Sequence, residues 1–318
     1  MQGPETPLPT LIQTSDHHAV LRHIRAHKLP NFSSLVIEHG QNLLQSKAWD
    51  SSLTEIERLA SLEQICVAAL EEQNIEFAKD LLKRIQTEVD ISAGSSDGDG
   101  GSPSISLRYR KLLGLTLESE ENYETALEFY NKMLQENPSN SHAYKRKYCI
   151  LKSQGKRKEA RQELNSYLET NGMDVGAWVE MANSCLEVGD YKGAAYCYEE
   201  VVLSSPMESG VHCILGEIYV TIGGIENLKL ARKHLSMSLE LDPDNQRAMY
   251  GLVSAAETYL ETVESDSKSS KKKKKNMFDE EDVEMAKDLY EYGVGKLSIS
   301  YKGTYMSSLL KMILDKED

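Results

Sequence analysis

The sequence has few of the large aromatic residues that fill deep globular cores. Its 318 residues include two tryptophans and four phenylalanines, against 16 tyrosines. Tyrosine keeps one end in contact with water, so this balance favours a thin core under an extensive wet surface. The chain length suits two average domains or one elongated repeat array.

Long hydrophobic runs are also missing. The longest apolar stretch is about six residues, Ile65–Leu70 (ICVAAL), whereas a membrane-spanning helix needs about 20. The N-terminal segment MQGPETPLPTLIQTSDHH lacks the basic and apolar regions of a signal peptide. We therefore expect a soluble cytosolic protein that reaches a membrane only through a partner.

The chain has no excess of positive charge and no paired-cysteine motif. Its net charge of -14 argues against general nucleic-acid binding, although a local basic patch remains compatible with it. The five cysteines are widely spaced, odd in number and without a CxxC motif. This pattern predicts free, buried thiols in a reducing compartment.

A 34-residue period runs through the middle of the sequence. Ala126, Ala160 and Ala194 are spaced at that interval, and each is followed four residues later by a large residue: Tyr130, Leu164 or Tyr198. A small residue lets two helices approach, and the large residue on the same face fills the gap between them. This spacing is typical of the tetratricopeptide repeat, a helix–turn–helix unit, and predicts an all-α solenoid of about five to six units.

The repeat frame predicts the domain organisation. The expected parts are a disordered tail (1–16), N-terminal capping helices (17–58), the repeat array (59–262), a charged flexible linker (263–278) and C-terminal helices that complete and cap the array (279–318). Within the array, the Gly/Ser/Asp-rich residues 91–106 are expected to form a flexible insertion.

The fifth unit is three residues longer than the others, and we expect the extra residues to lengthen the turn at GGIENL (223–228) and to push out a small loop.

No set of residues predicts catalysis. There is no nucleophile elbow, no phosphate-binding glycine loop and no HExxH motif, so we expect a protein that is not an enzyme and has no cofactor or metal.

His23 and His27 lie one helical turn apart but lack further ligands at suitable spacing, which favours a packing or solvated face. The run Lys271–Lys275 is interpreted as part of a solvated linker, with weak lipid contact or nuclear import as alternatives.

The concave face of such an array is lined by the first helix of each unit and commonly binds an extended peptide. Its predicted lining is basic in the middle units and more apolar later. The predicted groove residues are Arg108, Lys111, His142, Lys145, Lys152, Val179, Asn183, Leu186, Glu217 and Val220.

Three successive segments are more distinctive than the repeat itself: YKRKYCILKSQGKRKEARQELNSYLE (144–169), DYKGAAYCYEEVVLSSP (190–206) and GGIENLKLARKHL (223–235). Together they resemble subunit 2 of the endoplasmic reticulum membrane protein complex, clearly from about residue 107. The insertion and the lysine run depart from the usual form and suggest a divergent member, with a fungal member among the candidates.

The resemblance implies a scaffold without catalytic activity on the cytosolic face of the endoplasmic reticulum membrane, in a complex that inserts tail-anchored and multi-pass proteins. The implied partners are the insertase-like subunit 3, subunit 5, subunit 8 or its paralogue, and the cytosolic part of subunit 1. The alternative is a free cytosolic adaptor that recruits chaperones or other peptide ligands. Leu115 stands where chaperone-binding repeats need Asn, which disfavours that alternative.

Overall fold

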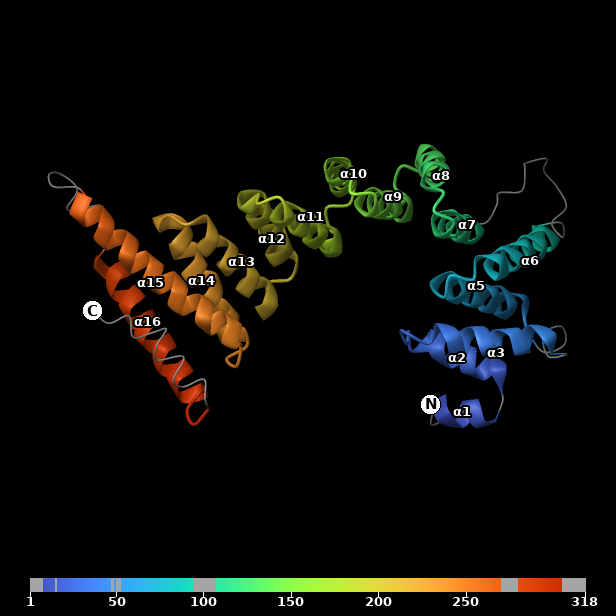
Figure 1. The fold of residues 1–318 in the computed structure, drawn as a ribbon, viewed down its shortest axis with the longest axis horizontal. Coiled ribbons are helices and arrows are strands. Elements are labelled where there is room, and N and C mark those ends of the chain that lie inside the picture. Colours follow the sequence, from blue (N-terminus) through green and yellow to red (C-terminus); the bar gives the residue numbers. More distant parts are fainter. Residues whose placement is uncertain are drawn as a thin grey trace. The chain divides into compact units, whose positions relative to one another are not determined.

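The structure is a computed structural model that describes residues 8–14, 16–46, 49, 53–93, 107–269 and 280–304. All regular secondary structure in those ranges is helical, as expected for an all-α solenoid. Internal contacts divide the chain into two compact units, residues 1–155 and 156–318. In each unit, consecutive helices pack against one another (Figure 1).

The first unit contains the N-terminal helices and the first repeats. Its helices are α1 (Leu8–Gln13), α2 (His17–Ala26), α3 (Ser33–Gln45), α5 (Glu55–Glu71), α6 (Ile75–Ala93), α7 (Leu107–Ser119), α8 (Tyr123–Glu136) and α9 (Ser141–Ser153). The pairs α5/α6 and α7/α8 are the first two predicted repeats. Helix α9 is the first helix of the third.

The second unit contains the remaining repeats. Its helices are α10 (Arg157–Thr170), α11 (Val175–Glu187), α12 (Tyr191–Ser204), α13 (Ser209–Ile222), α14 (Ile225–Leu241), α15 (Gln246–Ser269) and α16 (Glu280–Ser300). The pairs α11/α12, α13/α14 and α15/α16 match the predicted fourth, fifth and sixth repeats. Helices α8 and α12 end two residues before Pro138 and Pro206, because proline disfavours helical backbone in the residue before it.

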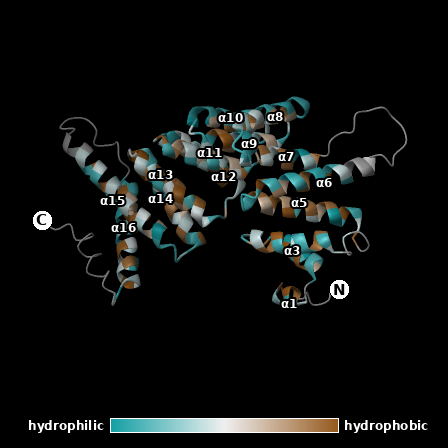
Figure 2. Ribbon diagram, turned by 45° about the vertical axis from the view of Figure 1, so that its right-hand side comes forward, coloured by the Kyte–Doolittle hydropathy of each residue, from teal (hydrophilic) through white to brown (hydrophobic). Residues whose placement is uncertain are grey.

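Short polar side chains fix where many first helices begin. Asn140, at the start of α9, accepts a hydrogen bond from the Ala143 amide, and Asp174, at the start of α11, accepts one from the Ala177 amide. Thr54 forms a capping box with Glu57 at the start of α5. The ribbons in Figure 2 carry hydrophilic and hydrophobic residues in turn, as expected for amphipathic helices that bury one face.

The predicted small-then-large pairs form the contacts between the two helices of a repeat. Ala126 and Tyr130 are both fully buried. Gly114 on α7 faces Tyr130 so closely that a Cβ atom added to it would lie 2.4 Å from the tyrosine oxygen. In the fifth repeat, Gly216 faces Leu235 in the same way, at 2.6 Å. Small residues on one helix therefore admit large residues from its neighbour.

Several predicted boundaries differ from the structure. Helix α1 occupies Leu8–Gln13 of the supposed tail, because Leu8 and Leu11 pack against the core of the first unit. Helix α15 continues to Ser269 through the start of the supposed linker, because Val263 packs against the cluster around Leu228, Tyr259 and Ala286. Helix α5 begins at Glu55, within the expected cap, and α6 ends at Ala93, within the expected insertion. The rest of the insertion (94–106), the rest of the linker (270–278), Lys271–Lys275 included, and residues 305–318 lie outside the described residues.

The expectation of a protruding loop at GGIENL is wrong. Only Gly223 and Gly224 lie between α13 and α14, and residues 225–228 form the first turn of α14. Both glycines have positive φ, 71° and 84°, a region that only glycine adopts at low cost. The side-chain amide of Asn227 donates to the Gly223 carbonyl at 2.7 Å. The extra residues thus lengthen a helix rather than a turn.

The cysteines follow the prediction with one exception. None of the five forms a disulfide, and Cys66, Cys185, Cys197 and Cys213 are buried. Cys149 is exposed, because it lies on the side of α9 that faces a groove. No helix in the described part of the chain is both long enough and apolar enough to cross a membrane.

Candidate partner-binding groove

Within the first unit, the first helices of three repeats line a groove of about 500 Å³. Both apolar and polar side chains line it. The lining residues are Val67, Leu70, Glu71 and Gln73 from α5 and the turn after it, Leu115, Glu118, Ser119 and Tyr123 from α7 and the start of α8, and Arg146, Cys149, Ile150 and Ser153 from α9. Helical periodicity places these residues on the face that the repeat pattern predicts to be concave.

An ion pair forms part of the lining of this groove. Arg146 donates from Nε to Glu118 Oε1 at 2.8 Å and makes a second contact through Nη2. The Tyr130 hydroxyl donates to the same carboxylate at 2.6 Å. The hydrogen bond to Glu118 is the main cause of a raised pKa at Arg146, and burial raises the pKa of Tyr130. Glu118 and Arg146 therefore neutralise each other's charge within the groove lining.

Two of the predicted cations, Arg108 and Lys111, lie on α7 outside this groove. Arg108 Nε lies 3.2 Å from Glu63 Oε1 on α5. Burial raises the pKa of Glu63, while the charges of Arg108, Arg25 and Lys111 oppose that shift. The expected basic surface thus faces an internal carboxylate, and a partner's acid would compete with Glu63 for these cations.

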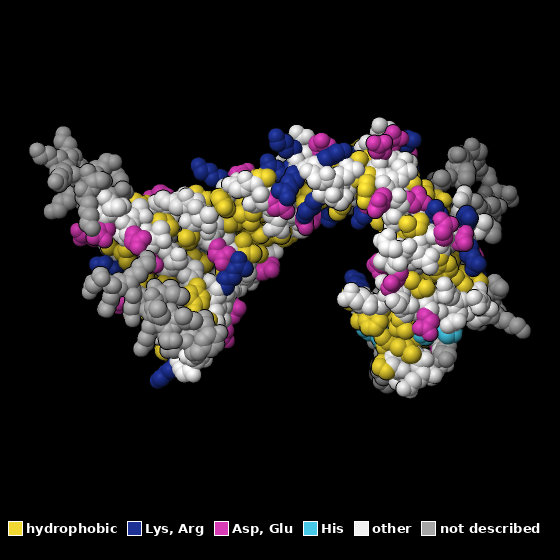
Figure 3. All heavy atoms as spheres, viewed as in Figure 1, with side chains coloured by type: hydrophobic (Ala, Val, Ile, Leu, Met, Phe, Trp, Pro, Cys, Tyr) yellow, Lys and Arg dark blue, Asp and Glu magenta, His cyan; other side chains and the backbone are white. Residues whose placement is uncertain are grey.

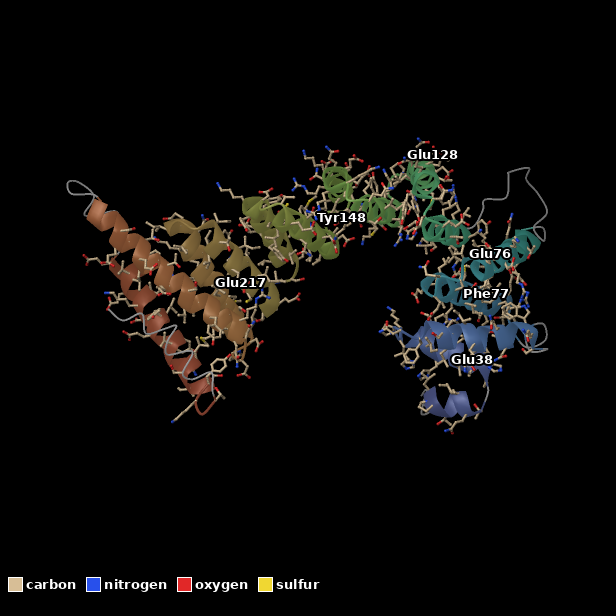
Figure 4. The ribbon with its side chains drawn as sticks, in the orientation of Figure 1. Glu38, Glu76, Phe77, Glu128, Tyr148 and Glu217 are labelled. Carbon is tan, nitrogen blue, oxygen red and sulfur yellow. The ribbon has the colours of Figure 1, made fainter. Side chains whose placement is uncertain are left out.

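The remaining predicted residues of this unit lie on α9, where Figure 4 labels Tyr148. His142 is half-buried, with its ring edge-to-face against Tyr130 at a centroid distance of 6.2 Å. Burial lowers its pKa, and the charges of Lys111 and Arg146 lower it further. Lys145 and Lys152 are exposed, and the Lys152 ammonium lies 5.5 Å from the centroid of the Tyr148 ring. His142 is thus a packing residue, whereas both lysines reach solvent.

In the second unit, the predicted residues lie on α11 and α13. Val179 and Leu186 are half-buried and Asn183 is exposed on α11, and Val220 is half-buried on α13. Glu217 on α13 (labelled in Figure 4) accepts two hydrogen bonds from Arg247 on α15, at 2.5 and 2.6 Å. The expected apolar stretch of groove therefore ends at an ion pair.

The sequence analysis did not identify the charged side chains that neutralise the predicted binding residues in the two units. On α9, Arg146 lies one position away from a first-helix position used for the prediction. Glu63 and Arg247 lie on the first helices of the first and sixth repeats, which the prediction did not include. A search for oppositely charged residues on successive first helices would have found the pairs Glu118–Arg146 and Glu217–Arg247.

Comparison with known proteins identifies the family. Residues 103–241 match the model of the EMC2 TPR-like repeat domain. The chain is 36% identical to ER membrane protein complex subunit 2-A of Xenopus laevis over 246 residues, which are 77% of this chain and 75% of that protein. The chain belongs to the ER membrane protein complex subunit 2 family.

Other members and relatives of this family come from distant organisms. The TPR repeat protein oca3 of Schizosaccharomyces pombe is 31% identical over 193 residues, 59% of this chain and 68% of that protein. The Dictyostelium discoideum ER membrane protein complex subunit 2 is 28% identical over 222 residues, 70% of this chain and 64% of that protein. The family-model match at residues 103–241 covers parts of both compact units.

Proposed function

We propose that this subunit 2 homologue is a scaffold without catalytic activity in the ER membrane protein complex, peripheral to the cytosolic face of the membrane. Its role is to bind cytosolic parts of the membrane subunits and so to support insertion of tail-anchored and multi-pass proteins. The relationship to the Xenopus subunit over three quarters of both chains carries this proposal. The proposed partners are the insertase-like subunit 3, subunit 5, subunit 8 or its paralogue, and the cytosolic part of subunit 1.

The first-helix faces supply the binding surfaces of this proposal. In the first unit, an extended segment lies along the apolar floor formed by Leu70, Leu115 and Ile150. Lys145 and Lys152 bind acidic side chains of that segment at the edge of the groove. Arg108 and Lys111 give up their interaction with Glu63 and bind a carboxylate of the partner instead. In the second unit, Val179, Asn183, Leu186 and Val220 receive an apolar segment, next to the Glu217–Arg247 pair.

Fractionation of cells that express a tagged chain tests this proposal. A scaffold of the membrane complex sediments with microsomes, co-purifies with membrane subunits by mass spectrometry, and is degraded when those subunits are depleted. A free adaptor stays in the soluble fraction, is stable to that depletion and co-purifies with chaperones. That second pattern would overturn the proposal.

A further inference from the structure

Helix α10 carries a row of hydrogen-bond donors along one side. Lys158, Arg161, Gln162, Asn165 and Ser166 recur at three- and four-residue intervals, so they share one face of the helix. With Met181 and Cys185 of α11 they line a pocket of about 570 Å³. Figure 3 shows Lys and Arg side chains gathered around α10.

This pocket differs in charge from four other pockets on the described residues. Its charged lining residues are Lys158 and Arg161, and its lining contains no carboxylate. The pockets at α2–α5, α5–α9, α14–α16 and α15–α16 each include at least one Asp or Glu. In a chain with a net charge of -14, a recess lined only by cations and neutral groups is a local exception that favours an anionic ligand.

The guanidinium of Arg161 has unused hydrogen-bonding capacity. Its Nη1 atom is buried and has no hydrogen-bond partner among the described residues. By contrast, Arg157 on the same helix lies 3.6 Å from Glu187. A buried donor without an acceptor costs free energy. A rotation of the half-buried Arg161 side chain toward a ligand carboxylate would recover it through a charge-assisted hydrogen bond.

The pocket lies apart from the proposed groove. Helical rotation of about 100° per residue puts Met181 and Cys185 on the side of α11 opposite Val179, Asn183 and Leu186. The other lining residues come from α10, a second helix of its repeat. A ligand here therefore leaves the first-helix face available.

We propose that this pocket binds the carboxylates of an extended acidic peptide segment of a partner protein. Lys158 and Gln162 are four residues apart, as are Arg161 and Asn165, which is about 6 Å along the helix. That distance is close to the roughly 6.6 Å between residues i and i+2, whose side chains share one face of an extended chain. The Met181 side chain offers an apolar contact for a neighbouring residue of the segment. Lys158, Gln162 and Asn165 are exposed, so an extended segment can reach them along the side of α10.

Fluorescence anisotropy with the full chain tests the site. The probe is a fluorescein-labelled peptide, Glu-Glu-Leu-Glu-Glu-Leu-Glu-Glu, and its counterpart has every Glu replaced by Gln. We expect the double variant K158Q/R161Q to weaken binding of the acidic peptide by about tenfold or more, because two charge-assisted contacts are lost. The matched control K83Q/K132Q removes two exposed lysine charges from the first unit and should leave binding within about twofold. The Gln peptide should not bind.

Three results would overturn the proposal. Equal weakening by both double variants would show a general effect of net charge. Binding to phosphatidylglycerol vesicles that depends on Lys158 and Arg161, without peptide binding, would assign the site to a lipid surface. A fall in the melting temperature of K158Q/R161Q alone would assign the two cations to the fold.

Discussion

Glu118 on α7 and Arg146 on α9 join the first helices of two successive repeats through an ion pair inside the first-unit groove. The side chain of Glu118 is 10% exposed and that of Arg146 is 32% exposed. Removing one partner of such a pair destabilises the fold, because the other charge is then left unpaired where water reaches it poorly.

Replacing Glu118 by Gln removes the charge and keeps the shape. We expect the free energy of unfolding to fall by about 1–3 kcal/mol, because Arg146 and Tyr130 lose a charged acceptor. Urea denaturation measures the change. The control Glu136→Gln removes the carboxylate that Arg110 binds at the surface and should cost much less. Equal losses in the two variants would contradict the assignment of a special role to Glu118.

Gly114 should tolerate no side chain, whereas Gly295 should. Gly114→Ala places a methyl group against the Tyr130 ring, and we expect a loss of about 1–3 kcal/mol in stability from overpacking. Gly295→Ala on α16 meets open space and should gain up to about 1 kcal/mol from helix propensity. Thermal unfolding of the two single variants gives the comparison. A stabilising Gly114→Ala would refute the packing argument.

The repeat and its core were predictable from the sequence, because they depend on local periodicity. Ala126 and Tyr130 pack as the 34-residue pattern requires, and the family resemblance came from the later segments 144–169, 190–206 and 223–235. The state of the groove was not predictable, because it depends on pairing between helices. Arg108 meets Glu63 and Arg146 meets Glu118 only after the helices have packed.

The three extra residues of the fifth repeat show the same limit. The sequence places them near Gly223, but their number alone does not tell whether they lengthen the loop or the helix that follows it. The structure selects the helix, because Leu228 in its first turn is fully buried in the cluster with Tyr259 and Ala286. Burial of that leucine favours helical residues over a solvated loop.

Acid should destabilise the second unit through a pair of histidines. His212 Nδ1 lies 3.0 Å from His234 Nδ1, and His212 Nε2 lies 3.0 Å from the Pro206 carbonyl. Burial lowers the pKa of His234, and His212 lowers it further. The unfolded chain therefore takes up a proton that the folded chain resists, so stability is full above about pH 7 and falls as the pH drops through about 6.5.

The variant His234→Gln should make stability less dependent on pH between 7.5 and 5. His39 and His142, whose pKa values are also lowered by burial, retain part of the dependence. Urea unfolding at several pH values measures the slope. An unchanged slope in the variant would show that His234 does not contribute.

The thiols should differ sharply in reactivity. Burial raises the pKa of Cys66 and of Cys197 to about 12, and it raises the pKa of Cys185 and Cys213. The thiolate is the reactive form, so only the exposed Cys149 should react quickly with a disulfide reagent at neutral pH. We expect about one rapid equivalent in the native chain and none in Cys149→Ser. Several rapid equivalents in the native chain would contradict the packing of the repeats.

Co-purification of the membrane subunits with groove variants tests the central claim most directly. The variant K111E/K145E reverses two charges on the proposed first-helix binding surface, and K83E/K132E reverses two exposed lysine charges elsewhere in the first unit. We predict that quantitative mass spectrometry will show a several-fold loss of subunits 3 and 5 with the first variant and wild-type recovery with the second. Wild-type recovery of those subunits with K111E/K145E would contradict the account.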